Sequence, residues 1–98
     1  MTSVEIRRVE TNKKQYLALL LLADEQEDMI DRYLERGSMY VLEDDGVKAE
    51  CVVTDEGGGV LELKNIAVEP DFQGKGYGKA LVDFLIRTYA GQYMLLQV

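Results

Sequence analysis

The spacing of hydrophobic residues switches along the chain between the period of a helix and the period of a strand. Ile30, Tyr33 and Leu34 recur at the spacing of one buried helix face, and Gly37 follows them as a helix terminator. Further along, hydrophobic runs are separated by short turns such as 44–46, which is typical of antiparallel strands joined by hairpins. The predicted strands are 4–9, 38–43, 47–54, 60–68 and 93–98, and the predicted helices are 13–23, 24–36 and a last one that follows 73–78 and ends at about 89.

These elements follow the order β-α-α-β-β-β-α-β. A strand–helix–strand connection normally makes its two strands parallel, so we expect a mixed, mostly antiparallel sheet with helices packed on it. Thr11 is the predicted N-cap of the first helix. The predicted fold class is therefore α/β, of the α+β type in which most strands are antiparallel. The 98 residues are expected to form one domain without repeats or linkers.

Composition and charge remove several classes of function. The formal net charge is −7, whereas a nucleic-acid-binding protein normally carries a basic surface. The longest apolar run, 16–23, is far shorter than the roughly 20 residues that span a bilayer, and the first residues lack the layout of a secretory signal. Cys51 is the only cysteine, which excludes an internal disulfide and favours a core position and a reducing cytoplasm. Since the sequence has no histidine, a metal site has little support.

The glycine-rich segment from Gln73 to Gly78 lies between a predicted strand and a predicted helix. Glycine allows positive φ and a close approach of a ligand to the backbone, and the first amides of a helix have no internal partner. Together they form a site for anions, above all phosphates. The dinucleotide pattern fails because Lys79 stands where it needs a third glycine, and the Walker pattern fails because Gly76 stands where it needs serine or threonine.

The spacing Gln73-x-x-Gly76-x-Gly78 resembles the acetyl-CoA motif of the GCN5-related N-acetyltransferase (GNAT) superfamily, and 63–70 resembles the strand before that motif. The resemblance implies a GNAT-like fold with acetyl-CoA as co-substrate. It also implies direct transfer of the acetyl group to a primary amine of an unidentified small-molecule or protein acceptor. The implied cofactor-binding residues are Ile66, Ala67 and Val68 along the pantetheine arm, and Gln73, Gly74, Lys75, Gly76, Tyr77, Gly78 and Lys79 around the pyrophosphate.

Carboxylates are the candidates for acid–base chemistry. Glu62 is the candidate general base, because it falls where the histone-type members of the superfamily carry theirs. The alternative is that Glu62 faces water between Leu61 and Leu63 on an ordinary alternating strand. Asn65 is expected to form local hydrogen bonds at a bulge. The acidic cluster from Asp24 to Asp28 either attracts a cationic amine or is a solvated helix start.

In the superfamily a further helix and two strands follow the fifth strand, together with a tyrosine that protonates the leaving thiolate. This chain ends at Val98, within the predicted fifth strand, so we expect the N-terminal portion of an N-acetyltransferase fold, apparently truncated there. Two alternatives stay open. One is a non-catalytic module that binds coenzyme A or another phosphate ligand. The other is a fragment that acts by association, such as a homodimer through the exposed edge strand from Met94 to Val98.

Overall fold

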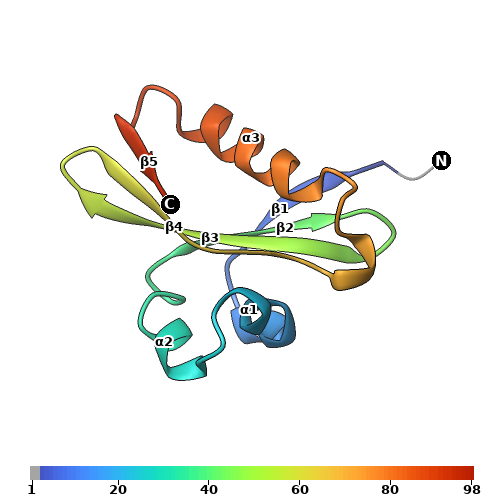
Figure 1. Cartoon of the computed structure of the whole chain (residues 1–98). Coiled ribbons are helices and arrows are strands. Elements are labelled where there is room, and N and C mark those ends of the chain that lie inside the picture. The colour runs from blue at the N-terminus through green and yellow to red at the C-terminus, as the bar shows by residue number, and fades with distance from the viewer. Residues whose placement is uncertain (1–2) are drawn as a thin grey trace.

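A five-stranded sheet forms the centre of the computed structural model, which describes residues 3–98 (Figure 1). The strands lie side by side in chain order. Each is antiparallel to the one before it except β5, which pairs parallel with β4. This confirms the predicted mixed, mostly antiparallel sheet. The strands are β1 (Glu5–Val9), β2 (Ser38–Glu43), β3 (Val47–Gly57), β4 (Val60–Val68) and β5 (Leu95–Gln97).

Helices cover both faces of this sheet. The helices α1 (Leu17–Ala23) and α2 (Glu27–Asp31) lie on one face, and α3 (Tyr77–Tyr89) lies on the other (Figure 1). Leu20 from α1 and Leu81 from α3 are both fully buried, each in a separate hydrophobic core. The central strand β3 is therefore covered on both sides. In the part of the chain that the structure describes, no helix is long and apolar enough to cross a membrane.

A β-bulge in β4 decides which side chains face which helix layer. Val52 in β3 pairs with Asn65, but the next residue of β3 pairs with Leu63, so Lys64 is an extra residue in β4. Before the bulge, Leu63 packs on the α3 side. After it, Asn65 turns to the α1 side, where its Nδ2 donates to the carbonyl of Leu20 at 3.0 Å. The hydrogen bond expected of Asn65 therefore exists, but it ties the sheet to α1 instead of closing the bulge locally.

The first predicted helix begins differently from the expectation. The segment 13–23 starts as a 3₁₀ helix, Lys13–Tyr16, and continues as α1. Its N-terminal flanking residue is Asn12, which has a left-handed conformation with φ of 51° and makes no side-chain cap. The predicted N-cap at Thr11 is therefore wrong. The tight turn at Asn12 places the chain directly into the narrower 3₁₀ helix.

The second predicted helix, 24–36, is shorter in the structure. Its α-helical part is α2, and turns follow as far as Arg36. Asp24 accounts for the delayed start, because its Oδ1 accepts a hydrogen bond from the Gln26 amide at 3.5 Å and its backbone is extended. A side chain that binds nearby backbone in this way competes with helix formation.

The other predicted elements agree, with ends that differ. The predicted strand 47–54 continues to Gly57 as β3, and the predicted strand 93–98 is limited to Leu95–Gln97. Cys51 is fully buried in the core on the α3 side, as expected, and this burial raises the pKa of its thiol.

A buried lysine holds the turn after α2. Lys13 is only 6% exposed, and its Nζ donates to three carbonyl oxygens. The distances are 2.9 Å to Leu34, 3.3 Å to Glu35 and 2.8 Å to Gly37. Carbonyls at the end of a helix need such donors, because the helix itself supplies none. The ammonium group thus replaces the hydrogen bonds that a longer helix would have made.

We expect Lys13→Met to lower the free energy of unfolding by about 2–3 kcal/mol, because it leaves buried carbonyls without a charged donor. Urea unfolding followed by circular dichroism measures the loss. Lys14→Met is the matched control, since Lys14 is exposed and pairs at the surface with Glu27 and Asp31. Its loss should be clearly smaller. Equal losses in the two variants would contradict the role given to Lys13.

Candidate functional site

The glycine-rich turn before α3 presents unpaired backbone amides. Gly74 and Gly76 have φ of 82° and 87°, a region that other residues adopt only with strain. Gly76 is the N-cap of α3, and no side chain caps this helix end. The first hydrogen bond within the helix runs from the Ala80 amide to the Gly76 carbonyl at 2.9 Å, so the amides of Tyr77 and Gly78 lie ahead of it. Together with the helix dipole, these amides can hold an anion.

Two predicted site residues fix this turn with their side chains. Gln73 Nε2 donates to the carbonyl of Val68 at 3.2 Å, which closes the turn back onto the end of β4. The hydroxyl of Tyr77 donates to Asp44, in the turn between β2 and β3, and this hydrogen bond raises the pKa of Tyr77. Both side chains therefore hold the turn in place, and the backbone amides stay available for a ligand.

Three lysines surround the turn. Lys75 Nζ lies 5.4 Å from the centre of the Phe72 ring, and Lys48 Nζ lies over the same ring at 4.3 Å. Lys79 forms an exposed ion pair with Asp83 at 2.8 Å. Lys48 is absent from the sequence prediction, because it comes from the start of β3 and only the folded sheet brings it to the turn.

A cavity of about 300 Å³ joins this turn to the edge of β4. β5 pairs only with Val60–Glu62 at the start of β4, so within residues 3–98 the rest of that edge has no neighbouring strand. Five of the ten predicted cofactor-binding residues, drawn from both segments, line this cavity, with one addition from α1; Gly74, Lys75, Gly76, Tyr77 and Lys79 are not among its lining residues. Leu22 is the addition; it is 49% exposed, and nothing in its local sequence distinguishes it from the other leucines of α1. The lining residues are Leu22, Ile66, Ala67, Val68, Gln73 and Gly78.

The candidate base Glu62 lies on β4 before the bulge, outside the lining of this cavity. Its side chain is about one quarter exposed, and its Oε2 forms an ion pair with Lys64 Nζ at 2.9 Å. The backbone of Glu62 pairs with Thr54 on one side and Gln97 on the other. The Lys64 ammonium group therefore occupies one of the two carboxylate oxygens of Glu62.

A second carboxyl, that of Glu50 on β3, is not a site residue that the sequence predicts. It is fully buried, and burial raises its pKa to about 8. Lys48 and Glu50 alternate with apolar residues, a pattern that is typical of a strand with one face toward solvent, so the sequence predicts an exposed Glu50. The structure differs because both faces of β3 are covered.

The acidic cluster lies at the junction of α1 and α2, as predicted, and several of its members have partners. Asp24 Oδ2 accepts a hydrogen bond from the Tyr33 hydroxyl at 3.3 Å. Glu27 pairs with Lys14 at 2.6 Å. Glu27 and Asp28 occupy the first turn of α2, where acidic side chains are favoured by the helix dipole.

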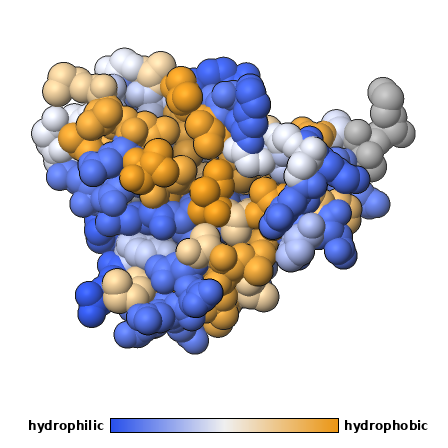
Figure 2. Space-filling view, in the orientation of Figure 1, coloured by the Kyte–Doolittle hydropathy of each residue, from blue (hydrophilic) through white to orange (hydrophobic). Residues whose placement is uncertain are grey.

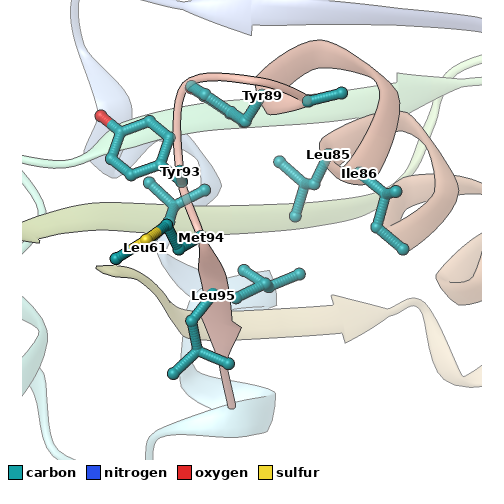
Figure 3. Close-up of a pocket in the computed structure, with 9 residues that line it drawn as sticks. Leu61, Leu85, Ile86, Tyr89, Tyr93, Met94 and Leu95 are labelled. Carbon is teal, nitrogen blue, oxygen red and sulfur yellow. The ribbon is translucent and has the colours of Figure 1, made fainter. Parts of the chain in front are cut away.

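An apolar groove of about 240 Å³ lies between α3 and β5. Figure 3 shows Leu85 and Ile86 of α3 facing it, with Met94 and Leu95 on the β5 side. Figure 2 shows hydrophobic residues gathered over the same region of the surface. Met94 is 86% exposed and Val98 is 91% exposed.

The chain is similar to known acetyltransferases in sequence. The family model described as an acetyltransferase (GNAT) domain matches residues 35–98. Over 74 residues the chain is 43% identical to YvbK of Bacillus subtilis (strain 168), an uncharacterized N-acetyltransferase, and the match covers 74% of this chain and 47% of that protein.

The structure is similar to solved acetyltransferases as well. An IAA acetyltransferase from Bacillus cereus ATCC 14579 matches with a TM-score of 0.81 and 39% identity, over 91% of this chain and 59% of that one. A GNAT family acetyltransferase from Elizabethkingia anophelis, solved with acetyl-CoA bound, matches with a TM-score of 0.82 and 30% identity, over 88% and 57% of the two chains. The chain thus spans about half to three fifths of the length of these relatives.

Proposed function

This chain belongs to the GNAT acetyltransferases, and from that premise we propose that it binds acetyl-CoA and transfers the acetyl group to a primary amine by direct attack on the thioester. One observation carries the proposal: a single cavity joins the free edge of β4 to the turn at the N-terminus of α3. We also propose that the acceptor is an unidentified small molecule or protein with a primary amine, and that the protein is cytoplasmic. Acetyl-CoA binding in the relative from Elizabethkingia anophelis supports the co-substrate.

The residues present fit acetyl-CoA. The turn from Gln73 to Lys79 suits the pyrophosphate, because the amides of Tyr77 and Gly78 precede the first hydrogen bond within α3 and lie at the positive end of that helix. The backbone at Ile66, Ala67 and Val68 suits the amide groups of the pantetheine arm, since an unpaired strand edge offers donors and acceptors in alternation. A methyl group added at Gly74 or Gly76 would meet no protein atom within 4 Å, so the space beside the turn is open to a ligand.

The net charge of −7 does not oppose an anionic ligand at this place. Charges farther away than about 8–10 Å are largely screened at physiological ionic strength. The amides, Lys48 and Lys75 act at short range, and Lys79 adds a charge that Asp83 partly balances. Local groups therefore determine the potential that a phosphate meets.

Isothermal titration calorimetry of acetyl-CoA into the 98-residue chain should show saturable binding, and Gly76→Asp should weaken it by at least about tenfold, or about 1.4 kcal/mol. The variant strains a backbone at φ of 87° and adds a negative charge to the anion site. Gly91→Asp is the matched control, since Gly91 has φ of 82° and lies beyond the other end of α3. Its affinity should stay within about twofold of the wild type. A folded wild-type chain that binds no acetyl-CoA would contradict the proposal.

Glu62 is the proposed general base, and Glu62→Gln should reduce kcat by about 100-fold or more and remove the acidic limb of the pH–rate profile. Thiol release from acetyl-CoA with a panel of primary amines measures both effects. Glu35→Gln serves as control because Glu35 is exposed in the turn after α2. Full turnover of Glu62→Gln at every pH would remove Glu62 from this role. Coenzyme binding without thiol release from any amine would instead support the non-catalytic module.

Association through β5 is a second candidate function, favoured by the edge of β5 that has no neighbouring strand within residues 3–98 and by the exposed Met94 and Val98. The proposed partner is a second copy of the chain, which would cover the groove between α3 and β5. Light scattering should give a larger mass for the full chain than for a chain without residues 94–98. Met94→Lys should lower the mass in the same way while leaving the fold intact. An unchanged mass in both variants would exclude this contact.

A further inference from the structure

Two buried polar groups near the centre of the sheet have no partner. Neither carboxylate oxygen of Glu50 forms a hydrogen bond among residues 3–98, and the same is true of Oδ1 of Asn65. Glu50 is fully buried and Asn65 is 3% exposed. Buried polar atoms almost always have partners, and a carboxylate without one is especially unfavourable. The two groups therefore indicate a site for a partner that is not a residue of this part of the chain.

Glu50 and Asn65 lie on the same face of the sheet. Glu50 in β3 is directly opposite Ala67 in β4, and Asn65 is two residues before Ala67 on the same strand. Residues that oppose each other across a ladder share a face, and their diagonal neighbours are about 7–8 Å apart. The Nδ2 of Asn65 points to the α1 side, where it also donates to the hydroxyl of Tyr33 at 3.0 Å. Both acceptors thus face the layer of α1 and α2.

This pair of acceptors lies beside the cofactor cavity. Ala67, directly opposite Glu50, lines that cavity together with Leu22 of α1. Ala67 therefore links the position of Glu50 in the sheet to the cavity. Leu22 is half exposed, so the wall on the α1 side is open to solvent at this point.

The surroundings of Glu50 are acidic or neutral. Val41 lies opposite it on β2, and Ala67 and Asn65 flank it on β4. Tyr33, in the segment after α2, is close enough to interact with it electrostatically. The hydroxyl of Tyr33 in turn contacts Asp24. Burial is the cause of the raised pKa of Glu50, and no lysine or arginine offsets it. Unpaired oxygens in surroundings without a positive charge suit a cation that donates hydrogen bonds, because such a group stabilises the ionised form of Glu50.

We propose that Glu50 and Asn65 form an ammonium-binding subsite beside the cofactor cavity, which takes the cationic amino group of the acceptor. The inference rests on the proposed function, because an amine held here lies next to the strand edge assigned to the pantetheine arm. An ammonium group has three donors and no acceptor, which matches the unpaired oxygens of the two side chains. Leu22 and Ile66 line the adjoining cavity, so the matching acceptor is a small primary amine with an apolar body.

Binding at this subsite releases a proton. With a pKa of about 8, Glu50 is mostly protonated at pH 7 in the empty site, and an arriving ammonium group ionises it. Affinity for the amine therefore rises with pH until Glu50 is already ionised in the empty site. Between pH 6 and pH 7 the rise is about tenfold. Tyr33 keeps its proton throughout this range, because burial raises its pKa above the ordinary value of 10.

The test is calorimetry with 2-phenylethylamine as the probe, titrated into the full chain saturated with coenzyme A. At pH 7, in two buffers with different heats of protonation, close to one proton should be released, and binding should be about tenfold tighter than at pH 6. The neutral analogue 2-phenylethanol should show neither effect. Glu50→Gln should abolish the proton release and weaken amine binding at least about tenfold, while Glu35→Gln should change neither.

The Gln variant has the size of Glu and lacks the buried charge, so it should fold and keep its affinity for coenzyme A. Amine binding to the wild type without proton release, no amine binding, or equal amine binding by Glu50→Gln would overturn the subsite. Failure of the wild type to bind coenzyme A would instead overturn the proposed function. In that case the same amine titration of the coenzyme-free chain decides the subsite.

Discussion

The extra residue at Lys64 is the constraint on which the site depends. A strand without a bulge would alternate strictly, and Asn65 would then share the face of Leu61 and Leu63 beneath α3. Its amide would be buried there without the Leu20 carbonyl as acceptor, at a cost of about 1–3 kcal/mol. The bulge reverses the alternation within one strand. Each half of β4 therefore suits a different neighbour, and α1 is bonded to the sheet beside the cavity.

The unpaired edge of β4 is also the part of the sheet that suits a ligand. An unpaired strand edge is normally a risk, because it offers hydrogen-bonding groups to any other chain. In this protein the edge at the end of β4 leads, through a short 3₁₀ helix at Pro70–Phe72, into the turn that starts α3. Gln73 and Tyr77 bond that turn to β4 and to the β2–β3 turn, so the unpaired amides keep a fixed position relative to the edge. A long ligand with amides and phosphates can thus be bound along one line.

The parts that the sequence predicted are those determined by neighbours in the chain. The order of elements follows from hydrophobic period, and the anion site follows from glycines next to a helix start. The lengths of the first helices depend on distant contacts, such as Lys13 bonded to Gly37, which no local pattern contains. The burial of Glu50 is of the same kind, since it depends on two helix layers that close over both faces of β3. Lys48 reaches the glycine-rich turn only through the pairing of β3 with β4.

A central strand covered on both faces makes its few polar residues more influential than any on the surface. A surface charge is screened by water and salt within about 8–10 Å, whereas a carboxyl under two helices keeps most of its interaction energy. Protonation removes the charge of Glu50 and leaves its oxygens without partners, so the empty fold satisfies this residue only in part. An apolar residue of similar size would make the empty fold more stable. Such a residue could not form an ion pair, however, so the protein would lose the buried carboxyl beside the cavity with which a cation can interact.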